Sequence, residues 1–381
     1  MPSNAPAVLS FFSIHPTRIG GTETFARELS AQIGAAGWQS VLSTLSAPPE
    51  PVARFLDLPN VRWETCACSS VTVQSLRQLA RILRRHRPRI LHLHYMGLVT
   101  PYPWLARAHG VERIFITDHH SRPEGSVPEP GARWKRVLRR LANVPITGIV
   151  SVSDSNRAFQ AALGAVPPDR IVRVYNGVDL TRTHDASHAE GFRRRHGIPA
   201  DRHLVVQVSM VIPQKGVGDL LAAAETVIAQ EPAAHFVFVG EGPARASYAQ
   251  AARQAGIGDH VTFTGPILDP VAEGVFAEAD VICQVSRWQE AFGWTIIEGM
   301  SFGKPVVGTR VGGIPELIED GVTGLLAERG NVQQIASLVL SLLRDPAARD
   351  RMGRAARAAV EAKFDLRANV RQLVDLYGIS G

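Results

Sequence analysis

Residues 8–37 read VLSFFSIHPTRIGGTETFARELSAQIGAAG, and this stretch predicts the fold of the first half of the chain. Residues 8–14 are mostly apolar and aromatic, as β-strands prefer. Gly20 and Gly21 follow, and residues 22–36 place apolar side chains four positions apart on one helical face. A strand, a glycine loop and a helix in this order indicate the first unit of a parallel, doubly wound sheet.

The same alternation continues through the first half. It predicts strands at residues 90–94, 113–117 and 146–152, and a helix at residues 73–85. The second half restarts the pattern after a polar stretch, with a helix at residues 219–229 and strands at residues 204–209, 235–239, 261–264, 281–285 and 305–308. The repetition is one of architecture and not of sequence.

The length of the chain predicts two domains, because 381 residues exceed the size at which one core usually stops growing. We place the first domain at residues 1–179 and the second at residues 180–365, with a linker near Leu180. The helical segment 366–381 is expected to cross back to the first domain. The predicted fold class is therefore α/β, with two Rossmann-like doubly wound domains.

Composition places the chain among soluble globular proteins, since 45% of its residues are hydrophobic and 20% are charged. Its first residues lack the pattern of a signal peptide, and no run approaches the roughly 20 apolar residues of a membrane helix. We therefore expect a cytoplasmic protein. Cys66, Cys68 and Cys283 are too few for a disulfide framework and lack zinc-site spacing, so unpaired thiols are predicted.

The formal charge of +6 suits an anionic partner such as a phosphate group or an acidic membrane face. Residues 133–140 form a basic segment in which Trp134, Val137 and Leu138, together with Leu141, can line one side of a helix. Such a helix either docks on its own domain or contacts the inner face of a membrane peripherally. Nucleic-acid binding is not expected, because no recognised module accompanies the charge.

Two carboxylates flank the segment 290–298, EAFGWTIIE, which follows a predicted strand. A helix that begins near Gly293 would direct its first backbone N–H groups and its positive end toward the preceding loop, where an anion such as a diphosphate can bind. Glu290 and Glu298 could then accept hydrogen bonds from a sugar hydroxyl on one side and a ribose diol on the other. The spacing of Glu290 and Glu298 alone is equally compatible with two carboxylates that face solvent.

Further motifs in fixed order make the second half similar to the retaining glycosyltransferases of family 4. They are Asn176-Gly177-Val178-Asp179, Lys215-Gly216, Gly240-Glu241-Gly242-Pro243, the segment 261–265, and the segment 290–298 continued through Gly312-Gly313 to Gly321 and Gly324. The resemblance implies the GT-B fold, in which the two domains face each other across a cleft. The first domain would bind the acceptor and the second the nucleotide-sugar donor.

The resemblance also implies roles for individual residues of the second half. Glu290 would contact the donor sugar near its anomeric carbon, and Glu298 would bind the ribose. Lys215 would bind the diphosphate and stabilise the leaving group without a metal. The remaining donor-binding residues would be Gly240, Gly265, Phe292, Gly293, Trp294 and Thr295, the backbone of Phe292 and Gly293 facing the sugar and phosphates.

In the first half, Gly20 and Gly21 resemble the glycine loop of the family, where the missing side chains let the backbone approach the donor phosphates and the acceptor. The segment Thr117-Asp118-His119-His120 resembles a threonine-any-histidine motif. His119 would then contact the donor sugar near the reacting carbon, with His120 as its competitor. His119, Glu290 and Lys215 form the predicted catalytic set.

One position departs from the family pattern. Family members commonly carry an arginine five residues before the lysine, and this chain has Met210 there. The departure affects the diphosphate site, for which Arg18 or Arg287 are the candidate substitutes. We expect a UDP-sugar donor, with GDP or ADP as other bases, no cofactor or metal, and an acceptor that is a saccharide, a lipid-linked sugar or a small molecule.

Two other functions fit parts of the pattern. A nucleotide-sugar epimerase shares the two-domain architecture but needs no acceptor and leaves the nucleotide attached to its product. A noncatalytic nucleotide-sugar or membrane-binding protein would account for Met210 in place of the arginine and for the basic helix. Such a protein would bind a nucleotide but catalyse no reaction. A nicotinamide dehydrogenase is disfavoured, because neither Gly20-Gly21 nor Gly240-Glu241-Gly242 completes a dinucleotide fingerprint.

Overall fold

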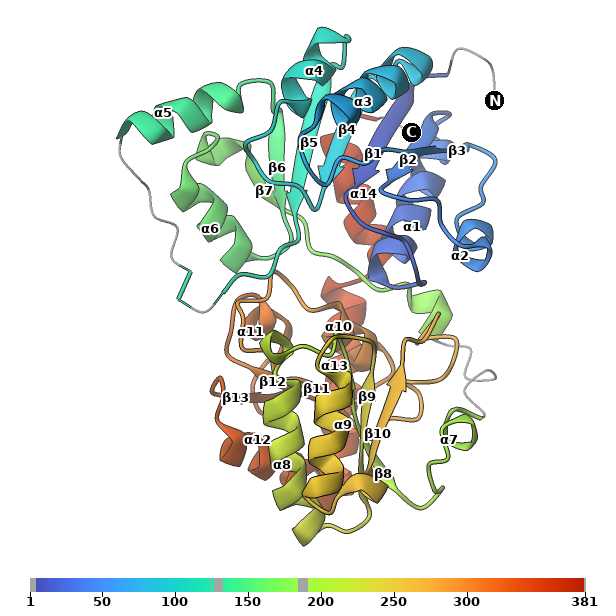
Figure 1. Cartoon of the computed structure of the whole chain (residues 1–381), viewed down its shortest axis with the longest axis vertical. Helices are drawn as coiled ribbons and strands as arrows, with labels where there is room; N and C mark the ends of the chain where they lie inside the picture. The colour runs from blue at the N-terminus through green and yellow to red at the C-terminus, as the bar shows by residue number, and fades with distance from the viewer. Residues whose placement is uncertain (1–4, 124, 127–132, 184–190, 380–381) are drawn as a thin grey trace. The chain divides into compact units, whose positions relative to one another are not determined.

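A computed structural model of the chain describes residues 5–123, 125–126, 133–183 and 191–379 (Figure 1). The backbone forms two compact units. Unit 1 comprises Met1–His120, Val127–Gly177 and Leu366–Gly381, and unit 2 comprises Ser121–Ser126 and Val178–Asp365. The chain therefore passes between the units several times.

Unit 1 is built, within its described residues, on a parallel sheet of seven strands in the order β3-β2-β1-β4-β5-β6-β7. The strand order reverses between β1 and β4, which makes the carboxyl ends of these two strands the switch point of the sheet. The strands are β1 (Ala7–Phe12), β2 (Gln39–Thr44), β3 (Val61–Thr65), β4 (Ile90–His94), β5 (Arg113–Asp118), β6 (Gly148–Ser151) and β7 (Ile171–Arg173).

Helices cover both faces of this sheet, because alternate residues of its strands point to opposite sides. One core packs Leu9 and Leu91 against α3 and α4, and the other packs Val8 and Ile90 against α1 and α14. The helices of unit 1 are α1 (Gly21–Ala35), α2 (Glu50–Phe55), α3 (Val73–His86), α4 (Tyr102–Ala108), α5 (Arg133–Ala142), α6 (Asp154–Leu163) and α14 (Leu366–Leu376).

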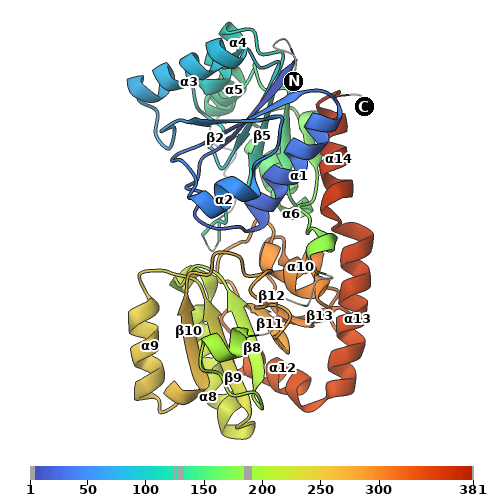
Figure 2. The same ribbon diagram turned by 90° about the vertical axis from the view of Figure 1, so that its right-hand side faces the viewer.

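Helix α14 completes the core of unit 1 from the far end of the chain. It lies beside α1, as both ribbon views show (Figure 2). Its buried residues recur at helical spacing on one face and join the core cluster that contains Leu29 and Ile33 of α1. These residues are Leu366, Val370, Leu373 and Val374, followed by Tyr377 just beyond the helix.

Unit 2 repeats the architecture with a parallel sheet of six strands, counted over its described residues, in the order β10-β9-β8-β11-β12-β13. The order again reverses once, between β8 and β11. The strands are β8 (His203–Val208), β9 (Ala234–Val239), β10 (Val261–Gly265), β11 (Val281–Gln284), β12 (Val306–Thr309) and β13 (Gly324–Ala327).

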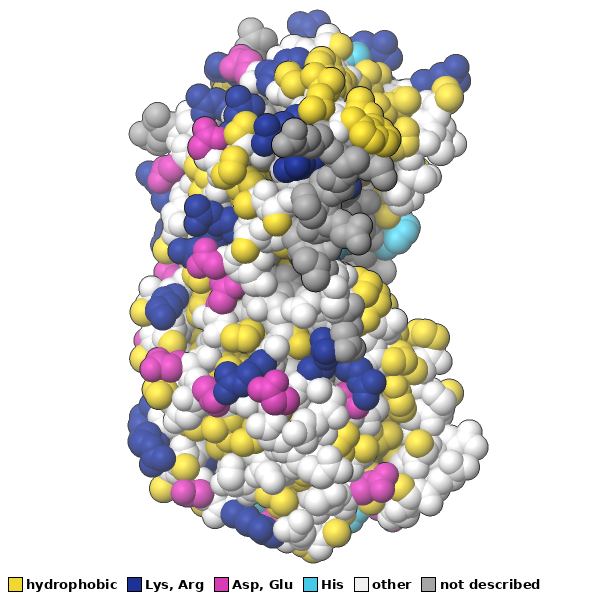
Figure 3. Space-filling view, turned by 90° about the vertical axis from the view of Figure 1, so that its left-hand side faces the viewer, with side chains coloured by type: hydrophobic (Ala, Val, Ile, Leu, Met, Phe, Trp, Pro, Cys, Tyr) yellow, Lys and Arg dark blue, Asp and Glu magenta, His cyan; other side chains and the backbone are white. Residues whose placement is uncertain are grey.

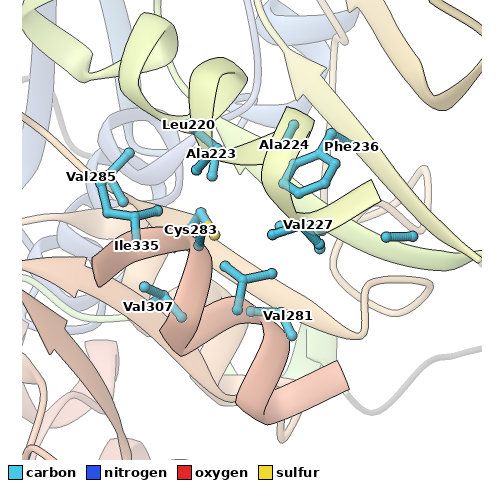
Figure 4. Close-up of a cluster of buried hydrophobic side chains, with 14 of the residues drawn as sticks. Leu220, Ala223, Ala224, Val227, Phe236, Val281, Cys283, Val285, Val307 and Ile335 are labelled. Carbon is cyan, nitrogen blue, oxygen red and sulfur yellow. The ribbon is translucent and has the colours of Figure 1, made fainter. Parts of the chain in front are cut away.

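The helices of unit 2 flank this sheet. They are α7 (Phe192–Arg195), α8 (Val217–Gln230), α9 (Arg245–Gln254), α10 (Trp294–Ser301), α11 (Ile314–Leu317), α12 (Val332–Arg344) and α13 (Pro346–Lys363). Figure 4 shows part of the core, in which Val281 and Cys283 of β11 lie among aliphatic side chains of α8 and α12. Burial raises the pKa of the Cys283 thiol, so this group stays protonated.

The structure differs from the sequence-based predictions in two respects. Cys66 and Cys68 were predicted to be unpaired thiols, and the structure joins them in a disulfide, whereas Cys283 is free. The prediction for the pair was wrong because it rested on the small number of cysteines, while these two residues follow β3 with their Cα atoms 5.5 Å apart. Strands β2, β3, β7 and β13 were also not predicted.

Candidate functional site

The predicted residues of unit 2 gather at the carboxyl edge of its sheet, at the switch point. Strand β8 leads into a 3-10 turn, Pro213–Lys215, and β11 leads into the loop that carries Glu290. These two strands are hydrogen-bonded neighbours. The turn lies tightly against the second loop, because a Cβ atom at Gly216 would lie 1.8 Å from the carbonyl oxygen of Val285.

Glu290 and Lys215, two members of the predicted catalytic set, form an ion pair. The Lys215 Nζ lies 2.7 Å from Oε1 and 2.9 Å from Oε2 of Glu290. The Ser286 hydroxyl donates to Oε1 at 2.6 Å, and the Ser121 hydroxyl donates to Oε2 at 2.7 Å. The Glu290 side chain is 7% exposed and that of Lys215 is 21% exposed. Four hydrogen bonds therefore fix an ionised carboxylate and hold an ammonium group at the sheet edge.

Helix α10 begins at Trp294, with Gly293 as its N-cap residue in a positive-φ conformation, φ 135°. The Thr295 hydroxyl donates to the carbonyl of Val208 at 2.9 Å, which anchors the first helical turn to the end of β8. Glu298 lies one turn further along the same helix. The positive end of α10 and the Lys215 turn thus both sit at the carboxyl end of β8, an arrangement suited to an anion.

Backbone contacts support the Glu290 loop from two sides. The Gly313 N–H donates to the Glu290 carbonyl at 2.8 Å, and a Cβ atom at Gly312 would lie 2.1 Å from that oxygen. On the other side, Gln289 and Arg122 exchange two backbone hydrogen bonds of 2.9 Å. Ser121 and Arg122 come from the first half of the sequence, so the site includes residues from both halves of the chain.

Gly240 and Gly265 lie at the same sheet edge, Gly240 directly after β9 and Gly265 as the last residue of β10. The Gly240 N–H donates to the Gly265 carbonyl at 3.0 Å. Gly240 has φ 137°, and a Cβ atom there would lie 2.1 Å from the Ser209 carbonyl oxygen. These glycines therefore let three loops approach one another closely. The Phe292 side chain is buried and packs against Trp294, with ring centroids 6.4 Å apart.

Met210 lies in the loop after β8 and is 60% exposed. Of the two arginines considered as substitutes for the missing cation, Arg287 donates to both carboxylate oxygens of Asp219, at 2.7 Å and 2.5 Å. Arg18 belongs to unit 1, where its guanidinium lies near Gly20. Within unit 2, Arg287 is thus already held by a buried carboxylate.

In unit 1, the predicted glycine loop and His119 also meet at the carboxyl edge of the sheet. Gly20 caps α1, and its N–H donates to the Glu23 carboxylate at 3.1 Å. The Thr22 hydroxyl lies 2.6 Å from that of Tyr95, whose ring stacks on His119 with centroids 4.4 Å apart. Burial raises the pKa of Tyr95 to about 12, so the phenol stays protonated. Tyr95 therefore links the start of α1 to His119.

His119 and His120 differ in their surroundings. The His119 imidazole packs against the rings of His94 and Tyr95, and burial lowers its pKa to about 3. The His120 side chain is 52% exposed and its Nδ1 lies 2.9 Å from the Asp118 carboxylate. A neutral, half-buried imidazole at His119 is thus followed by an exposed imidazole beside a carboxylate at His120.

Sequence reasoning missed several residues that shape these two edges. Ser121 and Ser286 hold Glu290, but no motif marks either serine. Tyr95 has a positive φ of 59°, unusual for a residue other than glycine, and it follows the His-any-His pattern of β4. The His-any-His pattern is visible in the sequence and could have marked this position.

The described residues also bear on metal binding and on membrane insertion. Among them, no three His, Cys, Asp or Glu side chains are grouped as metal ligands would be. None of the helices in this part of the chain has the length and apolar character needed to span a bilayer.

Two family models match the chain in succession. Residues 19–182 match the model described as Glycosyltransferase Family 4, and residues 189–359 match the model described as Glycosyl transferases group 1. Together they cover the elements from the first glycine loop to helix α13.

Curated relatives extend this similarity over most of the chain. A GDP-mannose-dependent alpha-(1-6)-phosphatidylinositol monomannoside mannosyltransferase of Mycobacterium tuberculosis is 30% identical over 283 residues, 71% of each chain. The N-acetyl-alpha-D-glucosaminyl L-malate synthase of Bacillus anthracis is 27% identical over 366 residues, 94% of each chain.

Solved structures share the fold. The HepE protein of Anabaena, crystallised with UDP and glucose, superposes with a TM-score of 0.78 at 19% identity, covering 98% of this chain and 99% of that one. This likeness identifies the two Rossmann-like units as the GT-B fold, as the sequence predicted.

Proposed function

Because the chain belongs to the family 4 glycosyltransferases, we propose that it moves a sugar from a nucleoside diphosphate donor to an acceptor hydroxyl with retention of anomeric configuration. Glycosyl transfer itself follows from the family. The nature of the donor, the stereochemistry and the residue roles are the proposal.

The observation that carries the proposal is the Lys215–Glu290 ion pair beside the start of α10. A departing nucleoside diphosphate develops negative charge, which an ammonium group and helix N–H groups can stabilise in place of a metal. Lys215 is held by Glu290 at 2.7 Å, so its charge is positioned before the donor arrives. Because the ammonium group is already in place, stabilising the leaving diphosphate requires little rearrangement of the protein during the reaction.

Glu290 is proposed to orient the donor sugar and not to attack it. Its two oxygens already accept four hydrogen bonds, including two from Lys215, which lowers the nucleophilicity of the carboxylate. Retention would then result from attack on the face that the leaving phosphate occupies, with the phosphate accepting the proton of the acceptor hydroxyl. Glu298 would hold the ribose, as in the family.

We expect donor binding to be detectable as a thermal shift that depends on Glu298. One of UDP, GDP or ADP should stabilise the protein by about 2–3 kcal/mol at roughly a hundredfold excess over its Kd, because the ligand binds only the folded state. UDP and GDP are the first candidates, since relatives and neighbours of this chain bear those nucleotides in their names. The Glu298→Ala variant should lose most of this shift.

The matched control is Glu225→Ala, which removes an exposed carboxylate from α8 in the same unit. It should leave the shift unchanged. Stabilisation by NAD alone, or by no nucleotide, would contradict the proposed donor site and favour a noncatalytic role. Conversion of the donor sugar without any acceptor would instead indicate an epimerase.

We further propose that α5 makes peripheral contact with an anionic membrane surface. Val137, Leu138 and Leu141 of α5 are 55–57% exposed. Trp104 of α4 is 49% exposed, and its indole N–H donates to the carbonyl of Ala142, the last residue of α5. We call these four side chains the apolar patch. Figure 3 shows apolar side chains beside Lys and Arg side chains on one face of the chain. An amphipathic basic helix of this kind suits the headgroup region of a bilayer.

The Leu138→Glu variant should bind vesicles that contain phosphatidylglycerol at least about tenfold more weakly than the wild type. Full burial of a leucine is worth about 1.5–3 kcal/mol, and the new carboxylate is repelled by the anionic surface. Vesicle co-sedimentation at low and high salt measures this effect. Val322→Glu, which changes an exposed valine of unit 2, is the control and should bind as the wild type does. Equal binding of all three proteins would refute the membrane contact.

A further inference from the structure

A column of imidazole rings lies beneath the carboxyl edge of unit 1. His92 and His94 alternate along β4, so both point to the same face, and both are 0% exposed. Their ring centroids lie 3.9 Å apart, and Phe12 stacks on His94 at 4.4 Å. His119, at the end of β5, adds the third imidazole, with its Nε2 3.3 Å from Nδ1 of His94.

These three imidazoles are neutral. Burial lowers the pKa of His92 and of His94 well below the ordinary histidine value, and lowers that of His119 to about 3. Each ring therefore carries a single N–H, on either Nδ1 or Nε2. In a contact between two such rings, one nitrogen must donate and the other must accept.

The surroundings of His94 decide which nitrogen donates. Its Nε2 is buried and has no hydrogen-bond partner within the described part of the chain. A proton on Nε2 would bury an unpaired N–H group, which is rarer in proteins than a buried acceptor without a partner. The proton of His94 thus belongs on Nδ1, where it faces His119.

His92 imposes no such choice. Its Nε2 lies 2.7 Å from the Thr117 hydroxyl, and its Nδ1 contacts the Tyr377 hydroxyl. A hydroxyl group can either donate or accept, so His92 is satisfied with its proton on either nitrogen. Of His92 and His94, only His94 fixes which nitrogen donates in its contact with His119.

We propose that His94 is a positioning residue that donates its Nδ1–H to Nε2 of His119, so that His119 carries its proton on Nδ1 and acts as a neutral hydrogen-bond donor. The functional part rests on the proposed glycosyl transfer. A neutral Nδ1–H can bind an oxygen of the donor sugar or of the acceptor and orient it. It supplies no proton to the reaction at neutral pH, so His119 is not a general acid.

The tautomer can be measured in the ligand-free protein, which separates this inference from the proposed activity. In the nitrogen NMR spectrum of imidazole-labelled wild-type protein, His119 should show a protonated Nδ1 and an unprotonated Nε2. The spectrum should not change between about pH 5.5 and 8, because the ring does not titrate there. The His119→Asn spectrum assigns the signals. A wild-type His119 protonated on Nε2 would overturn the inference whatever the enzymatic result.

Substitution of His94 provides a second test of the proposed tautomer of His119. Asparagine can place its amide N–H near the position of Nδ1, whereas phenylalanine keeps the ring shape without a donor. His94→Phe should therefore populate the other tautomer of His119 and lower kcat by about tenfold, the loss of one oriented hydrogen bond. His94→Asn should retain the Nδ1–H tautomer and most of kcat. A folded His94→Phe protein with unchanged His119 signals would show that His94 does not set the tautomer.

Discussion

Replacing Lys215 by methionine is expected to lower the rate of sugar transfer by about 10²- to 10³-fold, because the leaving diphosphate loses its positioned cation. The same variant should be less stable. Glu290, 7% exposed, would keep its charge but lose the ammonium 2.7 Å away, and breaking a buried ion pair on one side costs about 3 kcal/mol or more. Steady-state kinetics and thermal unfolding measure the two effects.

A double variant separates these two losses. In Lys215→Met with Glu290→Gln, the unpaired charge is gone, so the unfolding temperature should recover toward the wild-type value while transfer stays low. Lys363→Met removes an exposed lysine near the end of α13 and is the control for both assays. Transfer by Lys215→Met within tenfold of the wild type would contradict the proposed role of the lysine.

The second large effect is expected for Gly216→Ala, which should destabilise unit 2 by about 3 kcal/mol or more. Gly216 has φ 71°, and an added Cβ atom would lie 1.8 Å from the Val285 carbonyl oxygen, far inside van der Waals contact. The obstacle is backbone, so no side-chain rotation relieves it. Hydrogen exchange of peptides from α8 and β11 reports stability in this part of unit 2.

Gly256→Ala is the matched control for this substitution. Gly256 has nearly the same backbone conformation, φ 75°, but an added Cβ atom meets nothing within 4 Å. Its expected cost is about 1 kcal/mol, the penalty of the left-handed conformation alone. Equal destabilisation by both variants would mean that the loop after β11 moves aside, and that the close approach of the two loops is not essential.

The fold was predictable from the sequence where strands are buried and rich in aliphatic and aromatic residues. Strand β4 was predicted at its observed limits, and β8 and β9 within one residue, because strands buried on both faces have a strong apolar signal. The signal failed at the edge strands β3 and β13, and at the inner strand β2, QSVLST, which is mostly polar. Strand β3, VRWET, is partly exposed, and β13, GLLA, has only four residues and begins with glycine.

The candidate site was predictable only where a motif stays within one short segment. Residues 290–298 and the Lys215 turn are local, and the structure joins them by an ion pair that no spacing rule indicated. The Ser121 hydroxyl that also binds Glu290 is separated from it by 169 positions. A contact between residues so far apart depends on how the helices and strands pack together, which no local sequence motif shows. His94 shows a related limit, since its proposed direction of donation depends on a nitrogen that has no hydrogen-bond partner among the described residues.

The return of α14 to unit 1 has a consequence for biosynthesis. A ribosome releases the chain from the N-terminus onward, and domains generally fold as they emerge. Residues 178–365 of unit 2 are made before Leu366, Val370 and Tyr377 exist, yet those three side chains fill the core beside β1 and β4. Synthesis of unit 1 begins first, but its core can be completed only after all of unit 2 has been synthesised. Until then, its unfilled apolar face is open to chaperones and to aggregation.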